Sequence, residues 1–334
     1  MKVSFVIPAY NAEETILQAV ESALAQTLAP CEVIVADDAS TDSTVSALQT
    51  VRDERLKIVT LDVNGGPGMA RHAAMEAATG DVVACLDADD VAVPERLALQ
   101  VPLLEDNASV VLVCGDFAAS GDTSYRYRAP RSSGALAWSL HFRNPIATSS
   151  ATFRRAAALS VGEVASRMRL AEDHALWTAL ARKGSFVATP RVVAVRRVAG
   201  GTLTSRYTSE MEAASVAIGI EGIAALTGCT PSEDAYRLLR CGAGTGGAAE
   251  IVVDEAIEVW CTVFDAVQVG LASVADRNGA AKESLNELRR LLRADPHRRF
   301  GIWQRTVGPR TGAMMPALAS LSGLHVAWIM TGVR

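Results

Sequence analysis

Short hydrophobic runs alternate with segments of helical spacing along the first third of the chain. Hydrophobic and small side chains dominate residues 3–7, 32–36, 56–61 and 82–86, and these runs have the lengths of strands. Between the first two runs, hydrophobic residues of segment 16–28 recur every three or four positions, as on one face of a helix. Repeated strand–helix alternation predicts a parallel sheet with helices on both faces.

Local signals indicate where the helices of this sheet begin. Asn11, followed three residues later by Glu14, has the pattern of a capping box and predicts a helix start. The Ser-Thr-Asp string at 40–42 opens a second helix that runs through Leu48. The glycine-rich turn at 64–68 precedes a third helix.

The regular alternation then ends. Residues 118–134 are polar and rich in Gly, Ser and Arg, which predicts a mobile loop. We expect a returning strand within 144–155, a short helix over 175–180 and another strand at 192–195. The chain after these elements is rich in alanine and has helical spacing.

Polar residues follow four of the predicted strands or turns. They are Pro8 to Asn11, Asp37-Asp38, Asn64 to Gly68 and Asp87 to Asp90. In open parallel sheets, ligands bind outside the carboxyl ends of the strands, and all four strings fall there. The sequence therefore predicts a binding site at this edge of the sheet.

The string Leu86-Asp87-Ala88-Asp89-Asp90 carries the most specific chemistry. Three carboxylates within four residues repel one another, and their burial without compensation is costly. A divalent cation between them would compensate, and carboxylate oxygens suit Mg²⁺ or Mn²⁺, which keep open positions for substrate phosphates. The alternative is a solvated acidic turn before a helix at Pro94.

Composition limits the class of protein. The chain has 334 residues, of which 49% are hydrophobic and 21% charged, as in a folded protein of one large or two smaller domains. The formal net charge of −5 argues against non-specific nucleic-acid binding. Neither a G-x-G-x-x-G string nor a P-loop follows the first strand, which argues against a nicotinamide or flavin enzyme.

Cysteine usage and the N-terminus predict a cytoplasmic protein. The six cysteines lie far apart without a C-x-x-C pair, and we interpret them as buried thiols in a reducing compartment. The hydrophobic start before Pro8 is too short for a signal peptide and is expected to be a strand.

The first 205 residues resemble the inverting family-2 glycosyltransferases of the GT-A fold. The resemblance implies a Rossmann-like, mostly parallel α/β sheet with helices on both faces and a mainly helical C-terminal region. The matching strings occur in the order of the family: Val6 to Asn11, Val33 to Asp42, Asn64 to Arg71, Leu86 to Asp90, Asn144 to Ile146 with Ser149-Ser150, and Glu172 to Trp177.

The resemblance implies a nucleotide-sugar donor, with a UDP-sugar favoured. Tyr10 would stack on the base, Asp37 would bond the uracil edge, and Arg71 would lie near the base and diphosphate. Asp89 and Asp90 would hold Mn²⁺ or Mg²⁺ or the ribose, and either could be the direct ligand. The implied donor site comprises Pro8, Ala9, Tyr10, Asn11, Asp37, Arg71, Asp87 and Asp89.

The resemblance also implies a catalytic base, Asp173, with Glu172 as a supporting neighbour. The acceptor hydroxyl must lose a proton as it attacks the anomeric carbon, and a carboxylate within reach takes that proton. Displacement from the opposite face inverts this carbon. The alternative for this acidic pair is a helix start favoured by the dipole.

The chain departs from the family at one position. Many members carry a histidine after the last strand, whereas residues 195–201 here contain none. Either the metal has fewer protein ligands, or Arg196 or Arg197 offsets phosphate charge, or metal dependence is weakened. We do not expect His72 or His174 to be metal ligands, because lone histidines have low specificity.

Three parts are expected: a nucleotide-sugar-binding part at 1–115, an acceptor and catalytic-base part at 116–205, and a helical region at 206–334. The helical region would contact the acceptor, a second copy of the chain or a membrane. Its uncharged segment 311–333 is long enough to span a bilayer, but Gly, Ser, Thr and Pro dilute its hydrophobicity, which favours a packed or dimer-forming helix over contact with the inner face of the membrane.

Two alternatives to an active glycosyltransferase stay open. A non-catalytic partner protein could keep the fold without turnover. A sugar nucleotidyltransferase would share the sheet, but it would carry a basic glycine-rich loop where Pro8 to Asn11 stand. The sequence leaves the acceptor open among a saccharide, a lipid-linked carrier, a peptide and a natural product.

Overall fold

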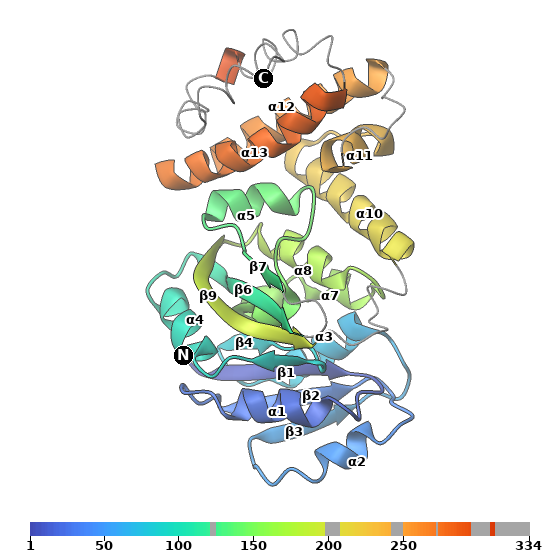
Figure 1. Ribbon diagram of the computed structural model, residues 1–334, viewed down its shortest axis with the longest axis vertical. Coiled ribbons are helices and arrows are strands. Elements are labelled where there is room, and N and C mark those ends of the chain that lie inside the picture. The colour runs from blue at the N-terminus through green and yellow to red at the C-terminus, as the bar shows by residue number, and fades with distance from the viewer. Residues whose placement is uncertain (121–124, 198–207, 242–249, 272, 295–307, 311–334) are drawn as a thin grey trace. The chain divides into compact units, whose positions relative to one another are not determined.

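A computed structural model describes residues 1–120, 125–197, 208–241, 250–271, 273–294 and 308–310 (Figure 1). The chain divides into two compact units. The first comprises residues 1–129 and 144–214, and the second comprises 130–143 and 215–334. Residues 130–143 thus belong to the helical unit, although the sequence analysis grouped them with the acceptor part.

The first unit contains a mixed sheet with the strand order β3-β2-β1-β4-β8-β6-β9-β5, and β7 pairs with β6. Four neighbouring strands are parallel: β3 (Leu56–Thr60), β2 (Glu32–Asp37), β1 (Val3–Ala9) and β4 (Val82–Cys85). Residues of β1, β2 and β4 are buried throughout, which explains their almost continuous hydrophobic runs.

Helices cover both faces of these parallel strands, as expected (Figure 1). Phe5 and Ile7 of β1 pack in one core with α1 (Ile16–Leu24), α2 (Thr44–Leu48) and α4 (Arg96–Glu105). The alternate residue Val6 is buried on the opposite face, where α3 (Pro67–Ala77) contacts β1 and β2.

The remaining strands make the sheet mixed. β8 (Thr152–Arg154) is antiparallel to both β4 and β6 (Val110–Ser120), whereas β9 (Ser185–Arg197) is parallel to β6. β5 (Asp90–Ala92) joins β9 at the edge, antiparallel. The prediction of an α/β fold with a mostly parallel, GT-A-like sheet is confirmed for the parallel half and extended by these antiparallel pairs.

The predicted loop at 118–134 is wrong for most of its described residues. Strand β6 continues to Ser120, and β7 (Tyr125–Tyr127) pairs antiparallel with it. The buried Asp116 carboxylate accepts hydrogen bonds from the Arg126 guanidinium at 2.7 and 3.1 Å, so long-range pairing fixes a segment whose composition suggests a turn.

The second unit is helical. Its core joins Trp138, Phe142, Tyr236, Trp260 and Phe264. Small residues bring two helices close together, because a Cβ added to Gly134 would lie 1.8 Å from the Asp276 carbonyl oxygen. The helices are α5 (Ser133–Leu140), α10 (Thr208–Thr227, which spans the unit boundary), α11 (Glu233–Cys241), α12 (Glu250–Gly270), α13 (Val274–Ala294) and the short η3 (Gly308–Arg310).

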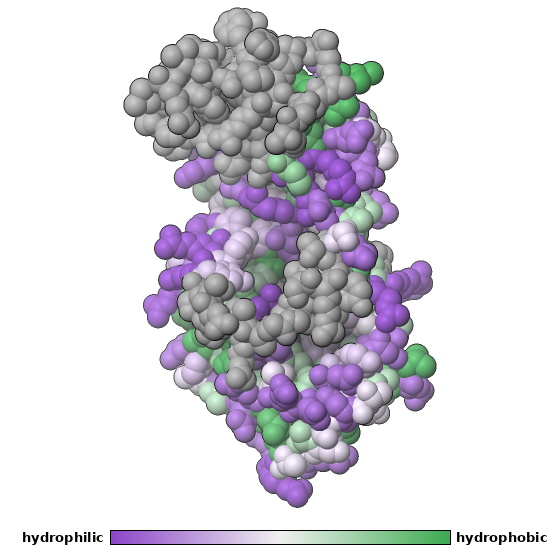
Figure 2. Space-filling model, turned by 45° about the vertical axis from the view of Figure 1, so that its right-hand side comes forward, coloured by the Kyte–Doolittle hydropathy of each residue, from purple (hydrophilic) through white to green (hydrophobic). Residues whose placement is uncertain are grey.

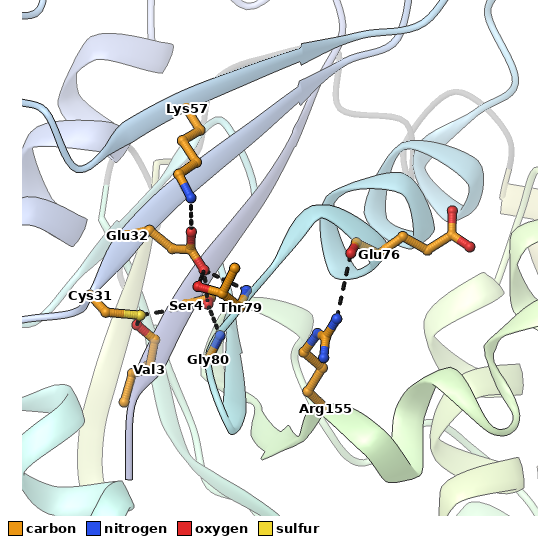
Figure 3. Close-up of polar contacts among 9 residues, drawn as sticks. All are labelled: Val3, Ser4, Cys31, Glu32, Lys57, Glu76, Thr79, Gly80 and Arg155. Carbon is orange, nitrogen blue, oxygen red and sulfur yellow. Dashed lines mark hydrogen bonds and ion pairs between the residues drawn. The ribbon is translucent and has the colours of Figure 1, made fainter.

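At the amino ends of the parallel strands, a buried carboxylate joins several elements (Figure 3). Glu32 Oε1 accepts hydrogen bonds from Ser4 Oγ at 2.6 Å, from the Thr79 amide at 2.6 Å and from Thr79 Oγ1 at 2.8 Å. Lys57 donates to Oε2. Burial raises the pKa of Glu32, but Lys57, Ser4 and Thr79 together lower it to about 2.

The exposure of the cysteines corrects the prediction that they are buried. Cys85 and Cys114 are buried as predicted, whereas Cys31, Cys229 and Cys241 are exposed. On the face drawn in Figure 2, described hydrophobic residues form separate patches among mostly hydrophilic ones. Among the described helices, none combines the length and apolar character needed to cross a bilayer. The uncharged segment 311–333 lies outside the described residues.

Candidate active site

The parallel register brings the predicted polar strings to one edge of the sheet. Ala9, at the end of β1, pairs with Asp37 at the end of β2, and Val6 pairs with Cys85 at the end of β4. The strings that follow these three strands therefore lie at neighbouring carboxyl ends, where ligands bind in such sheets. Pro8 and Ala9 are buried, whereas Tyr10 is 50% exposed.

Backbone strain is concentrated at the same edge. Within the described residues, the non-glycine residues with positive φ are Asn11 (49°), Ala39 (59°) and Ala171 (56°). Asn11 directly follows the candidate donor residue Tyr10, Ala39 lies two residues after Asp37, and Ala171 directly precedes Glu172. Left-handed backbone in residues with a Cβ is costly and clusters at functional sites.

Asn11 does not cap a helix, so the capping box is wrong. Its left-handed backbone directs the side chain toward the loop after β2, where Asn11 Oδ1 accepts a hydrogen bond from the Thr41 amide at 2.8 Å. The Asn11 amide donates to Ser40 Oγ at 2.9 Å. Helix α1 begins only at Ile16, and α2 begins at Thr44, later than predicted.

Asp37 and Asp38 have different surroundings. Asp37 Oδ2 accepts a hydrogen bond from the Ser40 amide at 3.1 Å, while its buried Oδ1 accepts none from the described residues. Asp38 accepts hydrogen bonds from the Gly65 and Gly66 amides, both at 2.8 Å. Burial raises the pKa of Asp38 above its ordinary value despite these bonds. Asp38 thus holds the glycine turn, a role that the sequence analysis missed.

Arg71 joins two carboxylates beneath the site. Its side chain on α3 is 3% exposed, with Nη1 2.9 Å from Glu172 Oε1 and Nη2 3.6 Å from Asp87 Oδ1. Burial lowers the pKa of Arg71, but the charges of Glu172, Asp87 and Asp173 raise it above its ordinary value. Arg71 therefore keeps its positive charge and links the end of β4 to α8 (Glu172–Leu180).

The acidic string after β4 contains a buried carboxylate without a hydrogen-bond partner among the described residues. Asp90 is 1% exposed, and neither of its oxygens accepts a hydrogen bond from the described residues. Burial and the charges of Asp87 and Asp89 raise the pKa of Asp90 to about 8, although nearby Ser149 and Arg196 lower it. Burial also raises the pKa of Asp87, with Arg71 opposing and Asp89 reinforcing the shift. Asp89 is half-buried.

Hard oxygen donors at this position fit a divalent cation that also binds substrate phosphates. The orphaned oxygens of Asp90, with Asp89 beside it in the chain, supply such donors. In the described part of the chain, however, no three His, Cys, Asp or Glu side chains converge closely enough to enclose a metal ion. A cation here would accordingly depend on the substrate for further ligands.

Asp173 is oriented by hydrogen bonds from three groups. Asn144 Nδ2 donates to Oδ2 at 2.8 Å, Thr148 Oγ1 donates to the same oxygen at 2.9 Å, and the His174 amide donates to Oδ1 at 2.7 Å. The carboxylate is half-buried at the start of α8. Roles for Asn144 and Thr148 were not predicted, although Asn144 lies in one of the strings that carried the resemblance.

Arg196 occupies the region where the family histidine is missing. Its Nε lies 3.7 Å from Asp90 Oδ1, and its guanidinium lies 5.4 Å from the centre of the Phe117 ring. Residues 198–201, part of the departing segment, lie outside the described residues. His174 is buried, and His72 is half-buried beside Glu76.

The fold and the carboxylates at the strand ends define a domain of the GT-A glycosyltransferase type. The first 349 residues of TarS from S. aureus superpose with a TM-score of 0.55 at 18% identity, covering 93% of this chain and 92% of that chain. The mannosyltransferase PcManGT from Pyrobaculum calidifontis, in complex with GDP-Man and Mn²⁺, gives a TM-score of 0.50 at 20% identity, covering 99% of this chain and 84% of that chain.

The chain belongs to glycosyl transferase family 2, whose family model matches residues 4–161. The amylovoran biosynthesis glycosyltransferase AmsE of Erwinia amylovora is 30% identical over 210 residues, which cover 61% of this chain and 78% of AmsE. The succinoglycan biosynthesis protein ExoO of Rhizobium meliloti is 42% identical over 121 residues, 34% of this chain.

A third relative is a UDP-Glc:alpha-D-GlcNAc-diphosphoundecaprenol beta-1,3-glucosyltransferase, WfgD of Escherichia coli, 37% identical over 105 residues, 31% of this chain. The chain spans only 35% of ExoO and 42% of WfgD.

Proposed function

We propose that this protein transfers a sugar from a nucleotide-sugar donor to an acceptor hydroxyl with inversion at the anomeric carbon. One observation carries the proposal. Arg71 contacts both Asp87, in the candidate donor site, and Glu172, the neighbour of the candidate base Asp173. This ion-paired bridge holds a donor-binding edge and an oriented carboxylate in one site, as group transfer between two substrates requires.

In the proposed reaction, the acceptor oxygen attacks the anomeric carbon while its proton passes to Asp173. The bond between that carbon and the diphosphate oxygen breaks on the opposite face, and the nucleoside diphosphate leaves. Asn144 and Thr148 hold the Asp173 carboxylate in a fixed orientation, which favours proton transfer to a positioned group.

The donor is proposed to be a UDP-sugar. Asp37 Oδ1 offers a buried acceptor for a base N–H, and Tyr10, which follows the Ala9 that pairs with Asp37, offers an exposed aromatic face. The name of WfgD specifies UDP-Glc, and TarS has a crystal structure in complex with UDP-GlcNAc. Pro8, Ala9, Asn11 and Asp87 complete the proposed donor site.

Asp89 or Asp90 would hold Mn²⁺ or Mg²⁺ together with donor phosphates. A bound cation at this position offsets the negative charge that develops on the leaving diphosphate. Arg196, 3.7 Å from Asp90, adds a fixed positive charge where many family members have histidine. We expect partial rather than complete loss of nucleotide binding when the cation is removed.

The proposed location is the cytoplasm, with contact at the inner face of the membrane when the acceptor is lipid-linked. The name of WfgD specifies an acceptor of that kind, GlcNAc-diphosphoundecaprenol. Whether residues 206–334 serve the acceptor, a second copy of the chain or a membrane stays a prediction.

A thermal-shift panel tests donor binding first. UDP, GDP, dTDP and CMP are each added with Mn²⁺, Mg²⁺ or EDTA, and the unfolding midpoint is measured. A ligand at 100 times its dissociation constant stabilises the native state by about 2.7 kcal/mol. We expect the largest shift with UDP and Mn²⁺ or Mg²⁺. No shift with any nucleotide would contradict the proposal and favour a non-catalytic protein with this fold.

The variant Asp173→Asn then tests the base. Transfer should fall at least 100-fold, the scale of general-base catalysis, while the UDP shift stays unchanged. Asp106→Asn is the matched control, because Asp106 is an exposed residue at the end of α4. Transfer by Asp173→Asn at the control rate would remove Asp173 from the mechanism.

A further inference from the structure

A row of paired residues crosses the sheet from the acidic cluster to an exposed aromatic side chain. Asp90 of β5 pairs with Arg196 of β9, Arg196 pairs with Ala119 of β6, and Ala119 pairs with Tyr125 of β7. Paired residues on neighbouring strands direct their side chains to the same face of a sheet. The Arg196 guanidinium over the ring of Phe117, two residues before Ala119, agrees with this shared face.

Exposure changes steeply along this row. Asp90 is 1% exposed and Ala119 is 4% exposed, whereas Tyr125 is 51% exposed. Because Ala119 has only a methyl group, no large side chain separates Tyr125 from Arg196 within the row. In the strand order, β9 lies between β5 and β6, and β7 pairs with β6, so Arg196 lies between Asp90 and Tyr125 in the row.

Strand β7 is also tied to the candidate base. Tyr127, two residues after Tyr125 and on the same face, donates a hydrogen bond to the Pro145 carbonyl oxygen at 3.1 Å. The preceding residue, Asn144, donates to Asp173 at 2.8 Å. Tyr125 therefore belongs to a strand that is hydrogen-bonded, through Tyr127, to the segment that orients Asp173. The same strand is joined to Asp90 by the row of paired residues.

The chemistry of Tyr125 suits a sugar ring. Three strand spacings place the Cα of Tyr125 about 14 Å from that of Asp90, within reach of a substrate that binds at the acidic cluster. A pyranose presents C–H groups on one face and hydroxyls around its rim. An exposed tyrosine offers an apolar ring face with a polar edge and so matches both features.

We propose that Tyr125 is an acceptor-binding residue that stacks on a sugar ring, so that the acceptor is a saccharide. This inference rests on the proposed function, because an acceptor site presupposes glycosyl transfer. Its prediction about saccharide binding is separate. Removal of the ring weakens saccharide binding while nucleotide binding and the base are unaffected.

Ligand-observed NMR tests this binding without turnover. Methyl glycosides of glucose, galactose, mannose and N-acetylglucosamine are mixed with the full chain and UDP, and saturation transfer from protein to glycoside is measured. We expect transfer to at least one glycoside, a several-fold loss in Tyr125→Ala and retention in Tyr125→Phe. Leu28→Ala, which truncates another exposed apolar side chain, is the control and should match the wild type.

Kinetics provides the second readout, with UDP release from UDP-glucose measured with and without the glycoside that binds. Tyr125→Ala should raise the acceptor KM about tenfold, equivalent to about 1.4 kcal/mol, with kcat and donor hydrolysis unchanged. An unchanged KM and unchanged saturation transfer in a folded Tyr125→Ala would overturn the inference and leave the proposed function intact. Glycoside binding that needs Tyr125, without UDP release from UDP-glucose, would instead support the inference and contradict the proposed reaction for that donor.

Discussion

Replacement of Glu32 by glutamine should destabilise the protein without affecting the candidate active site. Glu32 is 2% exposed and accepts hydrogen bonds from Ser4, Thr79 and Lys57 at the amino ends of the strands (Figure 3). These contacts lower its pKa from 4.5 to about 2. A shift of this size corresponds to about 3 kcal/mol of native-state stability at neutral pH.

The pH dependence of this contribution has a definite sign. Because the folded-state pKa is lower than the unfolded-state pKa, the contribution is complete above pH 4.5 and is lost as pH falls toward 2. In Glu32→Gln the Lys57 ammonium loses its anionic partner at every pH. The stability difference between wild type and variant should therefore be about 3 kcal/mol at pH 7 and shrink between pH 4.5 and 3.

Urea unfolding at pH 7, 5, 4 and 3 measures this difference, with Glu54→Gln as an exposed control that should stay within about 0.5 kcal/mol of the wild type. The UDP dissociation constant should be unchanged in Glu32→Gln, because Glu32 lies at the amino ends of the strands. Two results would refute the assigned role of the Glu32 charge. One is equal stability of Glu32→Gln and Glu54→Gln at pH 7, and the other is a stability difference between wild type and Glu32→Gln that stays constant from pH 5 to 3.

Three further substitutions probe the site. Gly68→Ala should lower stability by about 1–3 kcal/mol in thermal unfolding, because its Cβ would lie 2.5 Å from the Ala165 carbonyl oxygen. The control Gly270→Ala has open space around its Cβ and should be tolerated in the same assay. Arg71→Met should cost about 3–5 kcal/mol in urea unfolding by leaving buried Glu172 and half-buried Asp87 without their cation, and equal stability would contradict the ion-pair bridge. Asp90→Asn should raise the metal-free midpoint, since it removes a buried carboxylate whose oxygens accept no hydrogen bond from the described residues, and a lower midpoint would show that Arg196 compensates its charge.

The sequence predicts the parallel half of the sheet well because these strands are buried on both faces. Continuous hydrophobic runs then mark β1, β2 and β4 directly, and the predicted bounds differ from the observed ones by one or two residues. The segment from 118 to 134 fails for a physical reason. Its small and polar residues resemble a turn, and only the pairing of β7 with β6 and the ion pair between Asp116 and Arg126 reveal a strand.

The candidate site is predictable in its location but not in its internal contacts. Topology alone brings the ends of parallel strands together, so Asp37 and Asp87 could be assigned to one edge from the order of elements. Their partners come from distant segments. Asp38 binds amides 27 and 28 residues away, and Arg71 pairs with Glu172 across 101 residues, distances over which local sequence patterns carry no signal.

Glu32 and Asp90 are buried carboxylates at opposite ends of the strands, one in a stabilising network and the other in the candidate active site. Both are carboxylates of strands and both are buried, at 2% and 1% exposure. Glu32, at the amino end of β2, has partners for its charge, and its pKa falls to about 2. Asp90, after the carboxyl end of β4, has orphaned oxygens, and its pKa rises to about 8. Burial raises the pKa of both, but hydrogen bonds and Lys57 outweigh it at Glu32, whereas the charges of Asp87 and Asp89 add to it at Asp90. The fold stabilises the charge of Glu32 at the amino ends of the strands but leaves the Asp90 oxygens without hydrogen bonds from the described residues, which costs stability. Binding of a positive ligand at Asp90 would recover that stability.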